Sequence, residues 1–595
     1  MGTGCARRWT RLRAATAAAG LATALAAALA PAAHGGVTPD LADAMARALP
    51  VDRLPVIATL AGQAETRRGD PPARILGELR GRAVRTQRGL LARLGLTGAR
   101  GHWLVNAISL RASPLEIHLL AADRAVAGVD LDPPVALEEG PPPVGPLQAV
   151  PGNWGLEAVR APQAWREVGA TGASVRVGTI DTGVDARHPA LAGKVVGWRD
   201  VIGARPAPYD DHGHGTHTAG IIVGGDATLS PLGVAPGAKL LAAKAIRGDG
   251  TGVGSDIIAA AEWLADPDGD PATPDQPGVI SNSWGELSDA NDPWFRPVLR
   301  RWRALGIVAV FAAGNSGPGA GSVGSPSGYP EALAVGAAGQ DRRAADFSSR
   351  GPVAWENRDG LGPAPGPVPK PDLVAPGVNI VSSAPGGYRA YSGTSMASPH
   401  VAGVAALVRS ANPALGGPEV ERILRSSAAD IGPPGRDATS GEGLVDALAA
   451  TRAAAARRRP RARGGVRLTV AQLRINRRIA VGAATRVGRL EARLGTTAGP
   501  NPVTAAARAP IRRLTAAHMR LTQLISQSAL RRATAVQVLV AGTPAGAAAP
   551  LAAPRGRVRL TVGQLLINQR IAQAALRRVA ETERRAEASG MIPPG

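Results

Sequence analysis

The sequence predicts a doubly wound α/β domain with a mostly parallel sheet between residues 151 and 450. Short and almost continuously apolar runs recur through this region, which is typical of parallel strands that are covered on both faces. Helical patterns alternate with these runs, as the connections of a parallel sheet require. Polar motifs follow several of the runs, so we expect ligands at the carboxyl ends of the strands.

Five apolar runs are expected to be strands of this sheet: 173–180, 239–246, 279–283, 306–313 and 332–337. Two segments with helical periodicity are expected to pack against it: 255–265 and 396–410. A small α+β unit is expected before this domain, and a basic helical tail with repeats is expected after it.

Residues 1–33 have the order of a secretory signal peptide. Arginines between positions 7 and 13 precede an alanine- and leucine-rich run, and small residues follow. Such a run is too short and too weakly apolar for a stable membrane span. No later stretch is expected to cross a bilayer, so we expect a protein that is secreted, either extracellular or associated with the cell surface. The sole cysteine, Cys5, lies in this segment, so no disulfide is expected in the mature chain.

Residues 37–148 are expected to form a small α+β unit and a linker. Strand patterns at 54–60, 104–110 and 125–129 alternate with helical patterns at 73–94 and 114–122. The proline-rich stretch that follows, residues 132–151, is expected to be an exposed linker that a peptidase could cut.

The positive charge of the chain is concentrated in its tail. The formal net charge is +22, and residues 451–595 contain 27 basic and 4 acidic residues. Residues 151–450 contain 24 basic and 30 acidic residues, so the α/β domain itself is slightly acidic. Every Trp, Tyr and Phe precedes Thr451, which disfavours nucleic-acid binding by stacking of bases on aromatic rings.

The tail, residues 457–595, contains three repeats of about 46 residues. Residues 466–480 match residues 558–572, and a degenerate copy lies halfway between them. Capping boxes would begin a helix in each outer copy. Two interpretations stay open: a solvated spacer, or a segment that adheres to anionic cell-wall polymer, lipid head groups or extracellular nucleic acid.

Three motifs in the α/β domain carry the residue types of nucleophilic catalysis. Asp181 lies in Asp-Thr-Gly at the end of the first expected strand, His214 opens a helix in His-Gly-Thr-His, and Ser395 lies in Gly-Thr-Ser-Met-Ala at a helix N-terminus. A serine hydroxyl becomes a good nucleophile when an imidazole accepts its proton and a carboxylate orients that imidazole. Each motif alone is mostly turn chemistry, but the three together predict a catalytic triad.

These motifs resemble those of subtilisin-family serine peptidases over about residues 154–450. Further segments make the bacillopeptidase F-like branch the most similar: 279–285, 314–317, 347–352 and 371–377. The resemblance implies a subtilisin-like fold and a serine endopeptidase that hydrolyses peptide bonds in polypeptide substrates through an acyl-enzyme. It also implies that residues 37–148 contain an inhibitory propeptide and that the precursor matures by autoprocessing.

The resemblance assigns Ser395 as the nucleophile, His214 as the general base and then acid, and Asp181 as the carboxylate that orients His214. Asn315 would donate its side-chain amide to the oxyanion, and the Ser395 backbone amide would be the second donor. The positions implied to bind an extended substrate are Gly250, Thr251, Gly252, Ser283, Trp284, Gly285, Ala313 and Gly314. Ser316, near the expected specificity pocket, offers no charge to select a basic side chain.

No cofactor is expected for catalysis. Many subtilisins have a calcium-binding aspartate after a His-Pro pair, but this chain has Ala190 there, so a structural calcium ion stays open as an alternative that is unsupported at the usual site. The carboxylates of residues 266–270 are followed by Pro271 where a helix-loop-helix calcium loop needs glycine, which favours a solvated acidic loop. A competing function is a non-catalytic surface-binding protein that works through its basic tail, and the complete triad argues against it.

Overall fold

The structure, a computed structural model, describes residues 36–64, 69–138, 140–141, 144–147, 153–225, 231–285, 290–458 and 485. The chain divides into two compact units, Met1–Arg458 and Arg459–Gly595, and the helices and strands with defined bounds all lie in the first. The expected signal peptide and the tail repeats lie outside the described residues. Among the helices that are described, none is both long and apolar enough to span a bilayer.

Seven parallel strands form the central sheet, in the order β17-β14-β13-β12-β8-β10-β9. Their bounds are β8 Arg176–Asp181, β9 Val195–Asp200, β10 Lys239–Lys244, β12 Val279–Asn282, β13 Val308–Ala312, β14 Leu333–Ala338 and β17 Leu373–Pro376. The five predicted strands are present, with small shifts at their ends. The two edge strands were not predicted, because β9 is only partly buried and mixed in composition, and β17 is short and ends in a proline.

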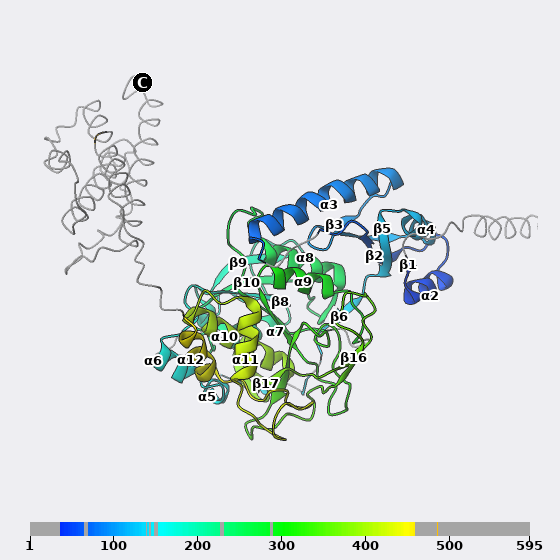
Figure 1. The fold of residues 1–595 in the computed structure, drawn as a ribbon. Helices are drawn as coiled ribbons and strands as arrows, with labels where there is room; N and C mark the ends of the chain where they lie inside the picture. Colours follow the sequence, from blue (N-terminus) through cyan, green and yellow to red (C-terminus); the bar gives the residue numbers. More distant parts are fainter. Residues whose placement is uncertain are drawn as a thin grey trace, which may run out of the picture. The chain divides into compact units, whose positions relative to one another are not determined.

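Helices cover both faces of this sheet (Figure 1). On one face lie α7 (His214–Val223) and α10 (Thr394–Ala411), and on the other lie α8 (Gly254–Ala265) and α9 (Arg296–Ala304). The inner strands are buried on both sides, and successive side chains alternate between the two helical layers. This arrangement explains why the strands have almost continuously apolar sequences.

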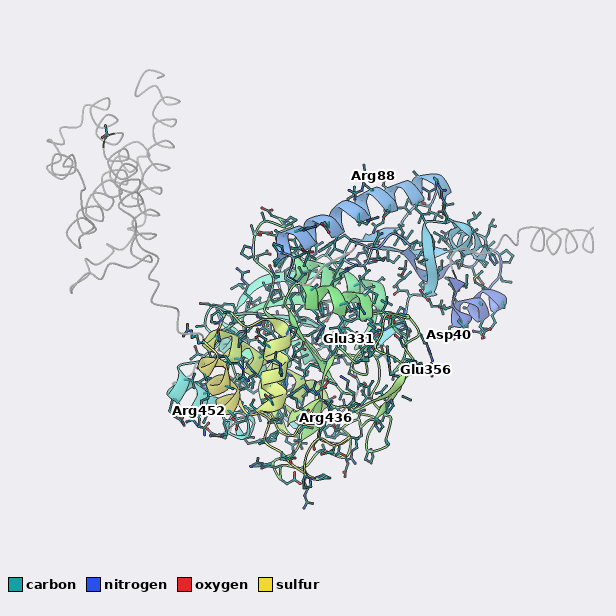
Figure 2. The ribbon with its side chains drawn as sticks, viewed as in Figure 1. Asp40, Arg88, Glu331, Glu356, Arg436 and Arg452 are labelled. Atoms are coloured by element: carbon teal, nitrogen blue, oxygen red, sulfur yellow. The ribbon has the colours of Figure 1, made fainter. Side chains whose placement is uncertain are left out.

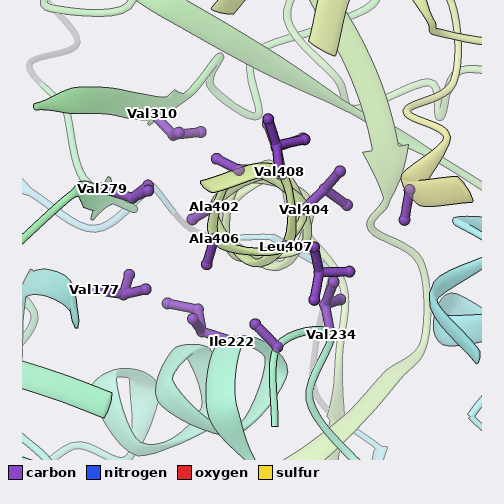
Figure 3. Close-up of a cluster of buried hydrophobic side chains, with 14 of the residues drawn as sticks. Val177, Ile222, Val234, Val279, Val310, Ala402, Val404, Ala406, Leu407 and Val408 are labelled. Atoms are coloured by element: carbon purple, nitrogen blue, oxygen red, sulfur yellow. The ribbon is translucent and has the colours of Figure 1, made fainter. Parts of the chain in front are cut away.

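Helix α10 lies at the centre of the larger core cluster. Figure 3 shows Val177, Val279 and Val310, from three neighbouring strands, around this helix. The side chains of Ala402 and Ala406 face the sheet, and because they are small the helix can approach the strands closely. Ser395, in the first turn of α10, is therefore attached to one of the most deeply packed elements of the molecule.

The remaining elements of the α/β domain surround this core. They are α5 Trp154–Ala158, α6 Ala161–Val168, η1 Pro189–Leu191, β11 Thr251–Val253, β15 Val353–Trp355, β16 Gly366–Val368, β18 Ile380–Ala384, β19 Gly387–Tyr391, α11 Gly417–Ser426 and α12 Ala447–Ala456.

Residues 36–131, called the N-terminal unit below, form a five-stranded sheet in the order β1-β5-β2-β4-β3. The strands are β1 Gly36–Val37, β2 Leu54–Leu60, β3 Arg100–His102, β4 Ala107–Ala112 and β5 Val126–Leu131, and the helices are α2 Pro39–Arg47, α3 Pro72–Leu94 and α4 Pro114–Ala122. Helix α3 is amphipathic: Leu76 and Leu79 are buried, whereas Arg88 points outward (Figure 2). Strand β2 and helix α4 have the bounds that the sequence predicts.

The N-terminal unit packs against α8 and α9 of the α/β domain (Figure 1). One apolar cluster includes Leu79 and Leu104 of this unit together with Ile257 of α8 and Trp302 of α9. Polar contacts surround the cluster: Arg80 Nη2 lies 2.7 Å from Asp266 Oδ2, Arg100 Nη1 lies 3.0 Å from Asp256 Oδ1, and the Leu104 N–H donates to Glu262 Oε1 at 2.8 Å. The interface therefore combines apolar burial with paired charges.

The prediction that residues 132–151 form an exposed linker is wrong for the first part of that stretch. Strand β6 (Pro134–Ala136) pairs antiparallel with β11, and Val135 is only 1 % exposed. A further strand, β7 (Val144–Leu147), pairs with β19. Proline lacks the N–H group that a strand donates to its neighbour, so the prolines of this stretch pointed to a linker and composition alone did not reveal the pairing.

Candidate active site

Asp181 and His214 meet where the ends of two elements converge. Asp181 is the last residue of β8 and His214 the first residue of α7, and both side chains are buried. His214 Nδ1 lies 2.7 Å from Asp181 Oδ1. Asp181 also accepts hydrogen bonds from the Thr182 N–H at 2.7 Å and from Thr218 Oγ1 at 3.0 Å. These bonds fix the carboxylate so that it holds the His214 ring in one orientation.

The electrostatics of His214 suit a general base. Burial alone would lower the pKa of His214, but the charge of Asp181 and its hydrogen bond outweigh burial, so the pKa is raised above its ordinary value. An imidazolium formed during a reaction would therefore be stabilised by Asp181.

Ser395 lies in the first turn of α10 and is buried. Its Oγ donates a hydrogen bond to the Ser283 carbonyl at 3.4 Å. His214 Nε2 is buried and has no hydrogen-bond partner among the described residues. The structure thus places the Asp181–His214 pair together, whereas proton transfer from Ser395 would require its side chain to rotate from Ser283 toward Nε2.

Asn315 donates its side-chain amide toward a backbone carbonyl in the cleft. Asn315 Nδ2 donates to the Glu138 carbonyl at 3.0 Å. Asn315 Oδ1 accepts from the Thr394 N–H at 2.8 Å and from Thr394 Oγ1 at 2.9 Å. Because two donors occupy Oδ1, the amide is held with its N–H group facing the carbonyl. This is the geometry that a side-chain donor to an oxyanion needs.

The expected substrate-binding backbone is occupied by residues 134–138 of the chain itself, called the docked segment below. Gly252 pairs with Val135 in the β11–β6 ladder, and the Gly250 carbonyl accepts from the Leu137 N–H at 3.0 Å. On the other side, Gly285 and Ala136 exchange two hydrogen bonds of 3.1 and 3.2 Å. The docked segment is therefore an additional strand between two backbone segments that are far apart in the sequence. Thr251, the first residue of β11, pairs with Ala136.

The other positions expected to bind substrate differ in their roles. Trp284 is 2 % exposed and packs edge-on against Phe295 and Phe311, so its side chain belongs to the core. Ser283 Oγ contacts the Ser395 carbonyl, at 3.1 Å. The Ala313 N–H donates within the central sheet rather than to the docked segment. Gly314, by contrast, lies beside the Glu138 carboxylate.

Two supporting residues were not anticipated from the sequence. Asp210 is partly buried and accepts hydrogen bonds from Thr182 Oγ1 at 2.8 Å, the Gly213 N–H at 2.8 Å and Thr216 Oγ1 at 2.6 Å. Burial raises its pKa, but these bonds outweigh burial and lower it. Asp210 thereby connects the turn after Asp181 to the start of α7. Thr394, which orients Asn315, precedes Ser395 within the Gly-Thr-Ser motif, and that position was the one signal in the sequence.

The histidines near the site are supports rather than bases. Burial lowers the pKa of His217 to about 3 and that of His400 to about 4, so both are neutral over the working range of most enzymes. His217 stacks on Tyr391, with ring centroids 4.4 Å apart. His400 Nδ1 lies 2.8 Å from the Met396 carbonyl within α10. Both rings serve as packed, hydrogen-bonded parts of the scaffold.

The residue after His188-Pro189 offers no side-chain ligand for calcium in this chain. Ala190 has no carboxylate, and its carbonyl accepts a hydrogen bond from the Gly225 N–H at 2.8 Å. Three carboxylates elsewhere, those of Asp266, Asp268 and Asp275, have oxygens within 4.8 Å of one another. Asp266 is paired with Arg80, and Asp268 accepts from the Asp270 N–H and Thr273 Oγ1. The partners of these two carboxylates are therefore protein groups.

Comparisons with known proteins agree with this geometry. The model of the subtilase family matches residues 172–443. Bacillopeptidase F of Bacillus subtilis (strain 168) is 40 % identical over 329 residues, which is 51 % of this chain and 22 % of that protein. Alkaline elastase YaB of Bacillus sp. (strain YaB) is 37 % identical over 328 residues, which is 55 % of this chain and 77 % of the elastase. Subtilisin Savinase of Lederbergia lenta is 37 % identical over 306 residues and is covered along its whole length.

Proposed function

Because the chain belongs to the subtilase family of serine endopeptidases, we propose that it hydrolyses peptide bonds with Ser395 as nucleophile, His214 as base and Asp181 as orienting carboxylate. One observation carries this proposal. The hydrogen-bonded Asp181–His214 pair and the Asn315 amide lie beside a cleft in which the protein's own backbone is bound as an extended strand.

The mechanism follows from these positions. Ser395 Oγ attacks the carbonyl carbon of the substrate while His214 Nε2 accepts the serine proton. The negative charge on the carbonyl oxygen is stabilised by the Asn315 amide and by the Ser395 backbone N–H. The peptide C–N bond breaks as His214 returns the proton to the leaving amine. Water then attacks the acyl-enzyme ester by the same route and regenerates Ser395.

The binding cleft supports a preference for extended polypeptides. Gly250 and Gly285 make main-chain hydrogen bonds with the docked segment, and such bonds are available to every residue type except proline. A catalytic cofactor is not part of this mechanism, because the side chains named above supply the nucleophile, the base and the oxyanion donor.

The N-terminal unit is proposed to be the propeptide of a secreted precursor and the inhibitor of its own peptidase. The docked segment lies in the substrate cleft and is hydrogen-bonded to both of its sides, so a substrate cannot enter. The apolar contact with α8 and α9 holds the N-terminal unit in place. Residues 1–33 would direct export. Autoprocessing between about residues 132 and 153 would then separate the propeptide from the peptidase.

The tail is proposed to determine where the enzyme is held, by attraction to cell-wall polymer or another polyanion. Its net charge, from 27 basic and 4 acidic residues, supports this role. The test compares the full chain with a chain ending at Arg458 in a low-salt pulldown on anionic polymer, with neutral polymer as the control. Equal retention of the two proteins would remove this role from the tail.

The test of the peptidase proposal uses Ser395→Ala and the unchanged chain side by side. We expect the unchanged chain to cleave casein and to be labelled by a fluorophosphonate probe, which reacts with activated serines. Ser395→Ala should do neither, and its precursor should remain at full length on a gel. Casein cleavage by Ser395→Ala, or processing of this variant without added protease, would contradict the proposal.

A further inference from the structure

The position of Glu138 indicates which peptide bond of its own chain the peptidase would cut. Its carbonyl accepts the Asn315 Nδ2 hydrogen bond of 3.0 Å that would otherwise stabilise an oxyanion. The preceding residues are paired on both sides of the cleft, by Gly250 and Gly285. Glu138 therefore lies where a substrate residue would bind immediately before the cleaved bond.

The chain on the other side of Glu138 continues past the nucleophile. A Cβ atom added to Gly140 would collide with the Ser392 carbonyl oxygen and would lie 3.5 Å from Gly393 Cα, in the loop that leads to Ser395. The backbone thus approaches the catalytic loop so closely at this position that only glycine fits without a shift. The contacts of Glu138 with Asn315 and of Gly140 with Ser392 and Gly393 are the observations from which we infer that Ser395 can reach the Glu138 carbonyl carbon.

The pocket that receives the Glu138 side chain is built from backbone. The Glu138 carboxylate accepts a hydrogen bond from the Asn315 main-chain N–H. A Cβ added to Gly314, whose φ is +107°, would lie 2.8 Å from Glu138 Oε1 and from Ser349 Oγ. A Cβ added to Gly285 would lie 3.6 Å from the same Oε1. The two glycines leave the space that the glutamate side chain fills.

The polarity of the pocket favours a hydrogen-bond acceptor. An N–H donor points at the end of the bound side chain, and Ser349 Oγ accepts from the Ser316 N–H, so its own hydrogen is free to donate. An ammonium or guanidinium group at this place would face the Asn315 N–H, which is itself a donor, and no acidic residue contacts this place among the residues that the structure describes, so a cation is unfavourable there. Burial raises the pKa of Glu138 and outweighs the hydrogen bond from the Asn315 N–H, which lowers it. The pocket therefore also suits a protonated glutamic acid and the uncharged side chain of glutamine.

We propose that this peptidase prefers glutamate or glutamine immediately before the cleaved bond and that its precursor cuts itself between Glu138 and Glu139. The proposal rests on the proposed function and adds a substrate class to it. In the first step Ser395 Oγ bonds to the Glu138 carbonyl carbon while His214 takes the serine proton. The bond to the Glu139 nitrogen then breaks, and His214 protonates that amine. Hydrolysis of the ester releases a carboxyl terminus at Glu138 and an amino terminus at Glu139.

The first experiment replaces Glu138 in the full-length chain with three residues. Glu138→Gln keeps the length and the acceptor, Glu138→Met keeps the length without the acceptor, and Glu138→Lys replaces the acceptor by a cation. We expect Glu138→Gln to mature at a rate close to that of the unchanged chain, and Glu138→Lys to mature at least tenfold more slowly or at another bond, with Glu138→Met between them. Intact mass and N-terminal sequencing should give Glu139 as the first residue of the unchanged mature chain.

Two outcomes would overturn the proposal: a different N-terminus in the unchanged mature chain, or processing of Glu138→Lys at the same bond and the same rate. The strand pairing and the Val135 contacts of the docked segment do not involve the Glu138 side chain, so all three variants keep those contacts.

The second experiment uses mature enzyme and the peptides Val-Ala-Leu-X-p-nitroanilide, with X as Glu, Gln, Met or Lys. We expect kcat/KM for Glu and Gln to exceed that for Lys at least tenfold. Casein cleavage and fluorophosphonate labelling are measured on the same preparation. Labelled, active enzyme with equal rates for all four peptides would refute the preference and leave the peptidase function standing. An unlabelled, inactive protein would instead refute the proposed function.

Discussion

Asn315 depends on one neighbour for its orientation. Its Oδ1 accepts both the main-chain N–H and the hydroxyl of Thr394, and Thr394 Oγ1 also accepts from the Gly314 N–H at 3.1 Å. The Thr394 hydroxyl thus contacts both Asn315, the oxyanion donor, and Gly314, which lies beside Glu138. Thr394 itself directly precedes Ser395. Thr394 is therefore a positioning residue, which acts through Asn315 without reaching the substrate itself.

Replacing Thr394 with valine should lower kcat about 3- to 10-fold with little change in KM. Valine keeps the shape but removes one of the two donors to Asn315 Oδ1, so the amide is less well held against the developing oxyanion. Steady-state kinetics on a peptide substrate measures both constants. Thr394→Ser, which restores the hydroxyl, should recover most of kcat, and a larger effect on KM than on kcat would contradict the positioning role.

The acid limb of the pH profile should lie above the ordinary histidine value of 6.5. Only neutral His214 can accept the Ser395 proton, and its raised pKa means that the ring stays protonated, and the enzyme inactive, to a higher pH than a free histidine would. Activity should therefore rise as pH increases through the pKa of His214. The pH dependence of kcat/KM checks this, and an acid limb below 6.5 would contradict it.

The sequence alone singles out Asp181, His214 and Ser395, because each lies in a short motif whose chemistry is local, and the structure brings the Asp181 and His214 side chains together. The sequence does not predict Glu138 as their neighbour. The contact between Glu138 and Asn315 joins residues 177 positions apart, and no local pattern records such a pairing. Asp210 was missed for a related reason, since its importance comes from hydrogen bonds with Thr182 and Thr216 after folding.

Among the elements, α10 connects catalysis to stability. Its N-terminal turn carries Ser395, and its middle lies against the sheet and against α7, α11 and α12 (Figure 3). Leu407 is fully buried in this core. Loss of packing here would change both the free energy of unfolding and the placement of the nucleophile.

Replacing Leu407 with alanine should lower the free energy of unfolding by about 2 to 5 kcal/mol, because the core relaxes only partly around the lost volume. The measurement is chemical denaturation in the Ser395→Ala background, which prevents self-digestion. Leu361 is 52 % exposed, so Leu361→Ala in the same background is a matched control that should change stability by less than about 0.5 kcal/mol. Equal effects of the two variants would contradict the packing role of Leu407.

The elements also show where sequence patterns stop being informative. The central strands and the long helices were predicted because burial on one or two faces imposes a period on the sequence. Strand β6 was predicted to be linker because Pro133 and Pro134 are turn residues in isolation. Its strand character comes from β11 and Gly285, which provide hydrogen bonds from outside the segment.

At the scale of the whole molecule, an acidic pair crosses the contact between the N-terminal unit and the α/β domain. Burial first, and the charge of Asp292 second, raise the pKa of Asp130 in β5 to about 6, although a hydrogen bond from Thr38 acts in the opposite direction. The part of this shift that comes from the charge of Asp292 disfavours the contact between the two parts when Asp130 is ionised. This unfavourable effect grows as pH rises from about 4 toward and beyond 6.

The N-terminal unit should therefore leave the cut precursor faster at pH 7.5 than at pH 5. We expect the rate at which activity appears after cleavage to increase between these values, measured by transferring samples to one common assay pH. Asp130→Asn cannot ionise and should show a smaller pH dependence. An equal dependence in the variant would assign the effect to other groups.

Because of the docked segment, the proposed self-cleavage depends on correct folding of the α/β domain. The bond after Glu138 reaches Asn315 only when β6 is paired with both β11 and Gly285, and these positions belong to strand connections on different parts of the central sheet. A chain whose sheet is incomplete cannot present that bond to Ser395. The proposed cut would consequently act as a checkpoint: a folding defect that separates β6 from β11 or from Gly285 would leave the precursor uncut, and proteolytic activity would come only from molecules in which these segments are assembled.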